Sequence, residues 1–185
     1  MVLQSQPEQE AELRYSAAVS NIVAYACNIA KASETYEVHS WMLLLGLLKE
    51  ETCVAAVVLQ DLGLDDLYGA WHEVLWALHV SDGLKPRAFT ADIVFDDKSA
   101  LILRATTNFA TWHGKDKVQS EDLLMALANG NILTGLFPDL PVDFAHVRVA
   151  IEARQGRRYV LPLDEPETAE SSPIASTEES DAEFI

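Results

Sequence analysis

Histidine, cysteine and carboxylate side chains are the groups in this sequence that could bind a metal or carry out catalysis. The histidines are spread along the chain, at His39, His72, His79, His113 and His146. Only His72 and His79 are spaced to share one helical face, two turns apart, and a zinc ion needs further ligands at suitable spacing. The sequence therefore predicts no metal site, and we expect no cofactor.

Candidate nucleophiles give no indication of an enzyme either. No G-x-S-x-G segment is present, so nothing points to the Ser, His and Asp arrangement of a hydrolase. Cys27 and Cys53 each lie in an apolar helical pattern, where a thiolate is disfavoured. None of the eight glycines belongs to a GxxxxGK segment followed by Ser or Thr, so these residues include no phosphate-binding loop of an ATPase. We expect a protein that is not an enzyme.

The charge of the chain argues against nucleic acid as a partner. The formal net charge is −16, and residues 164–185 contain eight acidic side chains and no Lys or Arg. Nucleic acid binds basic surfaces, so we expect no such partner. The apolar run at 41–48 is far shorter than the roughly 20 residues that cross a bilayer, and the first residues resemble neither a secretory signal nor a transit peptide. We therefore expect a soluble protein that does not bind membranes.

Composition divides the chain into a folded part and a tail. Pro, Ser, Thr and Glu dominate from residue 162 onward, and such a segment buries too little apolar surface to offset its chain entropy. We expect residues 162–185 to be a disordered acidic tail and residues 8–161 to form the folded domain. Apolar residues make up 49% of the chain, and four Trp, six Phe and five Tyr supply large side chains for its core.

The folded part contains an internal repeat with an offset of 80 residues. VHSWMLLLGL (38–47) aligns without a gap on VQSEDLLMAL (118–127), and this alignment pairs Gly46 with Ala126. Self-similarity of this kind indicates a repeated structural unit. The repeat divides the folded part into repeat one at 8–78, a linker at 79–94 and repeat two at 95–158.

Apolar residues recur at helical spacing in both copies. One stripe runs through Tyr15, Val19, Ile22, Ala26 and Ile29, and its counterpart runs through Phe95, Ile102, Thr106 and Phe109. Ser40 and Ser120 stand just before the Leu-rich runs, where a hydroxyl can accept a hydrogen bond from a backbone N–H and begin a helix. These patterns predict helices in corresponding places in the two copies.

The later part of each copy predicts further helices. The second copy is about two residues shorter there, so that LGLDDL (62–67) aligns on LPVDFA (140–145), with helices expected at 65–78 and 142–155. Only residues 159–163 resemble a strand. We therefore predict an all-α fold of two pseudo-repeats of about four helices each, packed as one domain because neither repeat would bury its apolar helices well alone.

The two Leu-rich segments and their flanks follow the pattern of a known family. The chain resembles the Clp N-terminal domain family, a double helical repeat found at the front of Clp AAA+ chaperones and in stand-alone accessory proteins. The resemblance rests on VHSWMLLLGLLKEE (38–51), VLQDLG (58–63) and VQSEDLLMAL (118–127), and it covers most of residues 13–156. It implies the double-repeat helical fold.

Among stand-alone members, the chain is most similar to the ClpT-type accessory subunits of the plastid Clp protease. This resemblance implies a non-catalytic subunit that binds the ClpP/ClpR ring and assists its assembly, stability or regulation. The implied partners are ClpP/ClpR core subunits and a Clp AAA+ chaperone, and the implied location is the chloroplast stroma. Two alternatives stay open: a substrate- or adaptor-recognition module, and a stand-alone protein of the bacterial cytoplasm.

One acidic position of the family differs between the copies. In bacterial ClpC-type relatives, a Glu after the Ser or Thr of both repeats helps to recognise phosphorylated arginine. Copy two keeps this pair as Ser120 and Glu121, whereas Trp41 replaces the Glu in copy one. The resemblance thus implies a residual ligand site at Ser120 and Glu121. The competing interpretation is that Glu121 is a first-turn acid favoured by the helix dipole.

Three groups of residues are candidates for contact with a partner. They are Arg148, Arg154, Arg157 and Arg158 near the end of copy two, Lys85, Arg87 and Phe89 in the linker, and Phe184 and Ile185 in the tail. Arginines could contact an acidic rim, and an apolar pair on a charged tail could enter a pocket. Each group also has an ordinary explanation: cations at a helix C-terminus, a connector between repeats, and a chance apolar pair in a disordered segment.

Overall fold

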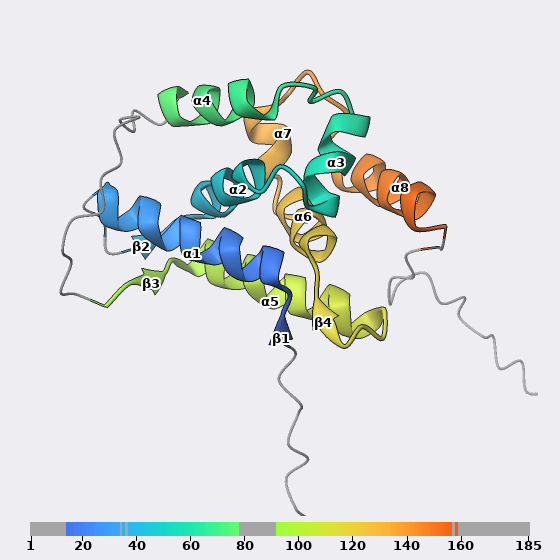
Figure 1. The fold of residues 1–185 in the computed structure, drawn as a ribbon, viewed down its shortest axis with the longest axis horizontal. Helices are drawn as coiled ribbons and strands as arrows, with labels where there is room; N and C mark the ends of the chain where they lie inside the picture. The colour runs from blue at the N-terminus through green and yellow to red at the C-terminus, as the bar shows by residue number, and fades with distance from the viewer. Residues whose placement is uncertain (1–13, 34, 36, 78–91, 157, 159–185) are drawn as a thin grey trace, which may run out of the picture.

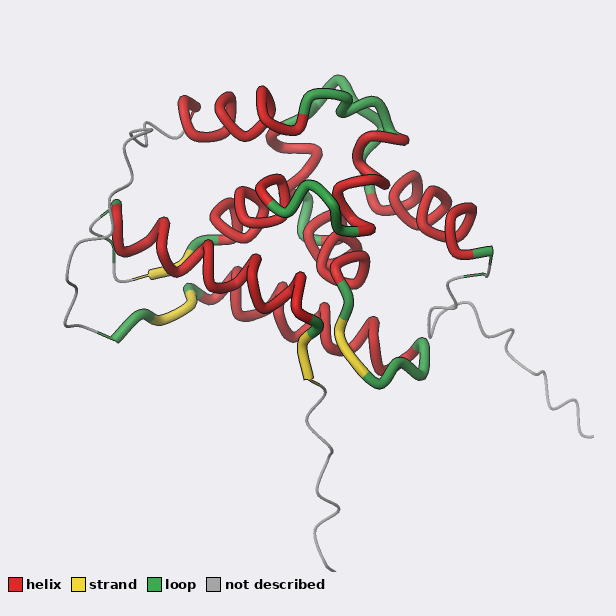
Figure 2. Tube along the Cα trace, viewed as in Figure 1, coloured by secondary structure: helices red, strands yellow, loops and turns green. Residues whose placement is uncertain are grey.

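Eight helices and four two-residue strands make up the part of the chain that the computed structural model describes, residues 14–33, 35, 37–77, 92–156 and 158 (Figures 1 and 2). In chain order they are β1 Arg14–Tyr15, α1 Ala17–Ala32, β2 Glu37–Val38, α2 Ser40–Lys49, α3 Val54–Asp61, α4 Leu67–Ala77, β3 Val94–Phe95, α5 Asp97–Trp112, β4 Lys117–Val118, α6 Ser120–Asn129, α7 Ile132–Leu136 and α8 Phe144–Gln155. The expected all-α fold, with four helices in each copy, is confirmed.

The repeat seen in the sequence is also a repeat of structure. The elements β1, α1, β2 and α2 return 80 residues later as β3, α5, β4 and α6, each with the same length as its counterpart. Ser16 caps α1 and Asp96 caps α5, and these residues are also 80 positions apart. The outer limits predicted for the two repeats, the linker and the tail fall largely outside the described residues and stay predictions.

Short strands join the two copies to each other. β1 pairs in parallel with β4, and β2 pairs in parallel with β3, so each ladder takes one strand from each copy. Sequence patterns did not predict these ladders, because two residues are too few to show alternation. Tyr15 and Phe95, placed in helical stripes by their spacing, lie in β1 and β3 instead. The strand-like residues 159–163 lie outside the described part.

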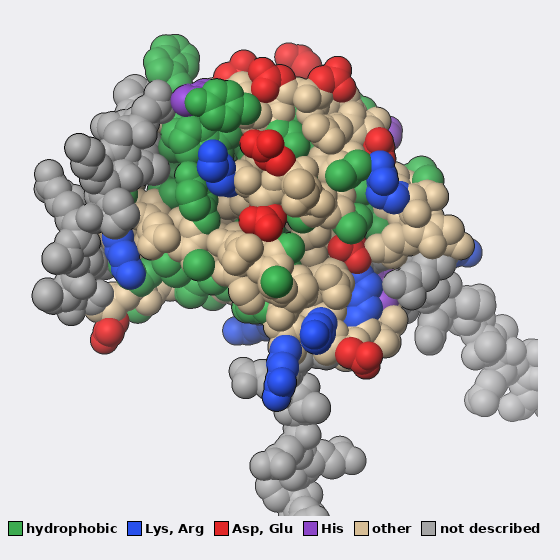
Figure 3. Space-filling view, viewed as in Figure 1, with side chains coloured by type: hydrophobic (Ala, Val, Ile, Leu, Met, Phe, Trp, Pro, Cys, Tyr) green, Lys and Arg blue, Asp and Glu red, His purple; other side chains and the backbone are tan. Residues whose placement is uncertain are grey.

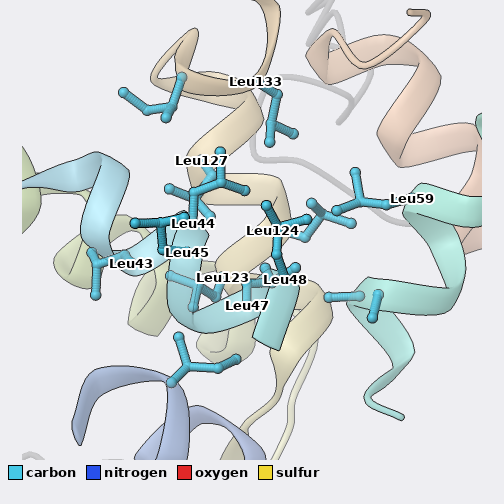
Figure 4. Packing of buried hydrophobic residues seen from close by; sticks show 14 of the residues in the cluster. Leu43, Leu44, Leu45, Leu47, Leu48, Leu59, Leu123, Leu124, Leu127 and Leu133 are labelled. Carbon is cyan, nitrogen blue, oxygen red and sulfur yellow. The ribbon is translucent and has the colours of Figure 1, made fainter. Parts of the chain in front are cut away.

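The two Leu-rich helices lie at the centre of the core. Residues 42–48 of α2 are all buried, as expected for a segment that is apolar on all sides. α6 is buried along nearly its whole length, and its buried residues include the polar Ser120, Glu121 and Asp122 at its start. α1 packs on α2 and α5 on α6, while α3 of copy one contacts α6 and α8 of copy two. Figure 4 shows leucines from α2, α3, α6 and α7 meeting in this shared core. The copies therefore share one hydrophobic interior.

The prediction that Ser40 and Ser120 cap their own helices is wrong. Each is the first helical residue, and the cap positions are His39 and Gln119. The Ser120 hydroxyl instead accepts a hydrogen bond from the backbone N–H of Ala55, at 3.3 Å, near the start of α3. The first N–H groups of a helix need acceptors, so copy two supplies one for a helix of copy one.

Aspartates fix the starts of α4 and α8. Asp66 accepts a hydrogen bond from the Gly69 N–H at 2.8 Å, and Asp143 accepts one from the Ala145 N–H at 2.9 Å. The helices consequently begin two residues later than predicted. Asp66 and Asp143 are therefore the corresponding residues of the two copies. The alignment of 62–67 on 140–145 shifts by one residue as a result.

Asp96 connects the start of α5 to copy one. Its carboxylate accepts hydrogen bonds from the Ser99 N–H at 2.7 Å and pairs with His39 Nδ1 at 2.7 Å, while its backbone N–H donates to the Val38 carbonyl. Burial acts to raise the pKa of Asp96, but the hydrogen bonds from Ser99 and His39 outweigh burial, so the pKa lies below its ordinary value.

Gly46 tests the close packing of α2 on α1. A Cβ at this position would lie 2.5 Å from the backbone oxygen of Ile22, so we expect Gly46→Ala to lower the free energy of unfolding by about 1–3 kcal/mol. Gly135→Ala is the matched control, because nothing lies within 4 Å of its added Cβ. Chemical denaturation of both variants checks this, and equal stabilities would contradict the packing described.

Asp96 predicts a pH dependence of stability. Because its folded-state pKa is lowered, its charge stabilises the fold above about pH 4, and this contribution is lost as the pH falls through the folded-state value. Asp96→Asn keeps a capping oxygen, so we expect it to destabilise the protein near neutral pH and the difference from wild type to shrink in acid. Urea unfolding over a pH series, with Asp97→Asn as control, measures this. A difference that widens in acid would contradict it.

Candidate functional site

The predicted ligand residues Ser120 and Glu121 open α6 and are buried. Glu121 Oε1 accepts hydrogen bonds from Lys115 Nζ at 3.0 Å and from Gln155 Nε2 at 2.9 Å. Asp122 Oδ1 accepts from the same Lys115 Nζ at 2.7 Å. Only 8% of the Lys115 side chain, 7% of the Glu121 side chain and none of the Asp122 side chain is exposed. One ammonium group therefore holds two buried carboxylates.

The loop between α5 and α6 positions this network. Gly114, with φ of +59°, reverses the chain after α5, and the Lys115 N–H donates to the Ala110 carbonyl at 3.0 Å. Asp122 also accepts a hydrogen bond from the Gln119 N–H at 2.9 Å through its other carboxylate oxygen. Gln155 reaches the network from the last turn of α8. Loop, helix start and a distant helix are thus joined by charge-assisted hydrogen bonds.

This arrangement supports the fold rather than presenting an open carboxylate. A hollow of about 480 Å³ lies beside it, lined by His113, Gly114, Lys115, Asp116, Lys117, Gln119 and Glu121. A cationic ligand entering there would have to displace Lys115 or Gln155 from Glu121, at the cost of breaking a buried ion pair. Recognition of phosphorylated arginine at Ser120 and Glu121 stays a prediction.

Copy one has an aromatic residue where copy two has Glu121. Trp41 is partly buried and stacks with His39, with ring centroids 6.2 Å apart and an interplanar angle of 22°. The next residue, Met42, is fully buried in the core. The corresponding position in copy one therefore carries no carboxylate.

Two of the candidate arginines form ion pairs within the domain. Arg154 contacts Asp61 at the end of α3, with Nε at 3.1 Å from Oδ2, which again connects the copies. Arg148 lies 3.8 Å from Glu152 on α8. Arg158 is exposed just beyond α8. The remaining partner candidates lie outside the described residues: Arg157, Lys85, Arg87, Phe89, Phe184 and Ile185.

The described residues offer little for catalysis or metal binding. Burial raises the pKa of the Cys27 and Cys53 thiols, which disfavours a reactive thiolate. Across the described ranges, no group of three or more His, Cys, Asp or Glu side chains is arranged to hold a metal ion. None of the helices in the described part is long and apolar enough to cross a membrane.

Residues 14–135 match the family described as the Clp repeat (R) N-terminal domain. The chain belongs to the Clp N-terminal repeat family. It is 55% identical over 179 residues to a Chlamydomonas reinhardtii protein named "ATP-dependent Clp protease ATP-binding subunit CLPT4, chloroplastic", an alignment that covers 97% of this chain and 71% of that protein. The predicted resemblance to ClpT-type members is thus confirmed.

Solved structures of Clp N-terminal domains share the fold at low sequence identity. The N-terminal domain of the chaperone ClpD from Arabidopsis thaliana is 16% identical, with a TM-score of 0.58, over 77% of this chain and 95% of that one. The Hsp104 N-terminal domain from Candida albicans is 14% identical, with a TM-score of 0.61, over 79% and 95% of the two chains. This Clp repeat protein therefore keeps a family architecture that tolerates wide sequence change.

One feature of this Clp repeat protein differs from the expectation that its aromatic residues lie in the core. Tyr68 and Trp76 on α4 are 57% and 85% exposed, and His72 lies between them on the same helical face. In the sequence, the signal for this exposed face was the i, i+4 spacing of the three rings, which sets them apart from the residues that α4 buries. Figure 3 shows hydrophobic and histidine side chains together over α4, with acidic side chains along the adjoining edge.

Removal of Lys115 tests the structural role of the buried network. Lys115→Met would leave Glu121 and Asp122 buried without their shared cation, so we expect the free energy of unfolding to fall by about 3 kcal/mol. Lys117→Met, at an exposed position two residues away, is the control and should change it by less than about 0.5 kcal/mol. Urea denaturation measures both. Similar values for the two variants would show that the network contributes nothing specific.

Proposed function

We propose that this Clp N-terminal repeat protein is a non-catalytic accessory subunit of the chloroplast Clp protease. It acts in the stroma, where it binds the ClpP/ClpR ring and assists the assembly, stability or regulation of that ring. One observation carries the proposal: 55% identity, over 97% of the chain, to a protein named as a chloroplast Clp protease subunit. The sequence of these 185 residues adds support, since no ATPase phosphate-binding loop occurs in it.

The arrangement of the domain fits a protein that acts through its surface. The Leu-rich helices of both copies fill one interior, and the acidic residues that open α6 bond to Lys115 and Gln155. These contacts hold the fold together, so the outward faces of the helices are left for partners. We place one contact at the basic end of α8, where Arg158 is exposed, because an acidic rim of a ring would attract it.

Native co-migration with a purified plastid ClpP/ClpR core tests this function. We expect the full chain to migrate with the core, and Arg158→Glu to weaken binding roughly tenfold because the charge reversal sets like charges against each other. Arg104→Glu is the matched control, since Arg104 is exposed on α5 and the charge change is identical. In the same experiment, a chain that ends at residue 163 measures whether the predicted tail contributes to binding of the core.

The outcomes of co-migration distinguish the proposed roles. Failure of the full chain to bind the core, with binding instead to a Clp adaptor or a tagged substrate, would contradict the accessory-subunit role and favour a recognition module. Equal effects of Arg158→Glu and Arg104→Glu would leave the subunit role standing but remove the contact at the end of α8.

A further inference from the structure

The outer face of α4 carries aromatic side chains that the core does not use. Tyr68, His72 and Trp76 follow one another at intervals of four residues and form a row along the helix, which we call the aromatic row. The adjoining face of α4 buries Leu67, Ala70, Trp71, Val74 and Leu75. Burial of the core therefore does not account for Trp76, which is 85% exposed.

Neighbouring side chains hold one end of this row in place. Tyr68 stacks on Trp71 with centroids 6.2 Å apart, and His72 meets both rings edge-on at 4.4 and 4.8 Å. Lys49 Nζ lies 5.9 Å from the Tyr68 centroid and 5.5 Å from the Trp71 centroid. Rings that are fixed before binding lose less conformational entropy when a partner covers them.

Copy two shows that the repeat fold does not require this row. Counted from the capping residues Asp66 and Asp143, the counterparts of Tyr68, His72 and Trp76 on α8 are Ala145, Val149 and Ala153. α8 occupies the corresponding place in its repeat with small or aliphatic side chains on this face. The aromatic residues are thus a property of copy one alone, and packing of the repeat does not explain them.

An acidic groove runs beside the aromatic row. It has a volume of about 440 Å³ and lies between the first turns of α4 and the connection from α7 to α8. Four carboxylates line it, those of Asp65, Asp66, Glu73 and Asp139, and none of its described lining residues is Lys or Arg. Glu73 lines the groove and lies three residues before Trp76 on α4, a spacing at which side chains are neighbours on the helix surface, so the groove and the row adjoin.

We propose that the α4 face binds a basic segment of a partner protein, with apolar side chains on the aromatic row and Lys or Arg in the acidic groove. Charge selects this occupant, because a cation entering the groove meets carboxylates from two directions. A second copy is disfavoured, since each chain carries −16 and symmetric pairing would set two acidic grooves against each other. The inference goes beyond the proposed function, because it concerns a surface of the chain and the chemistry of what binds there.

Fluorescence anisotropy with a short labelled peptide of Leu, Phe and Arg, added to the full chain, tests this surface. We expect the peptide to bind, and Trp76→Ala to weaken binding about tenfold or more, as for a central aromatic residue of an interface. Leu101→Ala is the matched control, because Leu101 is 59% exposed on α5, and it should change affinity less than about twofold. Trp76 is exposed, so the variant should keep its melting temperature.

Charge variants test the groove separately. Glu73→Gln should weaken peptide binding and reduce its salt dependence, whereas Glu37→Gln, at an exposed position on β2, should do neither. A second peptide with Glu in place of every Arg should not bind. The proposal is overturned if the Arg peptide fails to bind, if Trp76→Ala binds it as well as wild type does, or if the Glu peptide binds equally.

Analytical ultracentrifugation of the full chain tests whether a second copy of the chain, rather than a partner protein, occupies the α4 face. A dimer that Trp76→Ala converts to a monomer would show that a second copy covers the face, and would also overturn the proposal. A monomer in both cases is the expected result. Because the peptide experiment needs no Clp core, its failure and a failure of co-migration with the core are independent results.

Discussion

Hydrogen bonds exchanged between the two repeats are the constraint on which the rest of the structure depends. Each parallel ladder takes one strand from each copy, and the Ser120 hydroxyl accepts the Ala55 N–H near the start of a helix in the other copy. The Ser99 hydroxyl likewise donates to the Val38 carbonyl at 2.5 Å. Val38, Ala55 and Val118 are buried, and each has a backbone group whose partner lies in the other copy. Buried backbone groups left without partners are costly, so neither copy alone satisfies all of its own. The two repeats consequently form one unit.

The residues that join the two repeats are distinct from the surface residues by which the repeats differ from each other. α2 and α6 are alike because both must fill the shared core, and Glu121 lies in a network that ties the start of α6 to α8. The outward faces of α4 and α8 are free of that requirement and have diverged. One carries an aromatic row beside carboxylates, and the other has Arg154 in its last turn, with Arg158 just beyond it. Differences of function within a common fold are expected in such places.

Sequence predicted the elements whose signal is repeated and periodic. The offset of 80 residues and the apolar spacing predicted the helical class and the two copies, and the residues of the Leu-rich segments and their flanks carried the resemblance to the family. The sequence did not predict the parallel ladders, because strands of two residues show no periodicity. It also did not predict the hydrogen bond between Ser120 and Ala55, because these residues are distant in sequence. The contacts of Glu121 depend on how Gly114 turns the loop that carries Lys115. Exposure of Trp76 was missed because aromatic residues at helical spacing usually indicate core.

The most direct measurement expresses residues 1–78 and 79–185 as separate chains and follows helix content and thermal unfolding by circular dichroism, alone and after mixing. If the copies complete each other's hydrogen bonding, each chain alone should lack a cooperative transition, and mixing should restore helix content and a single transition. A cooperative transition in either chain alone, with the helix content of its half of the full protein, would show that the repeats fold independently and would contradict this central claim.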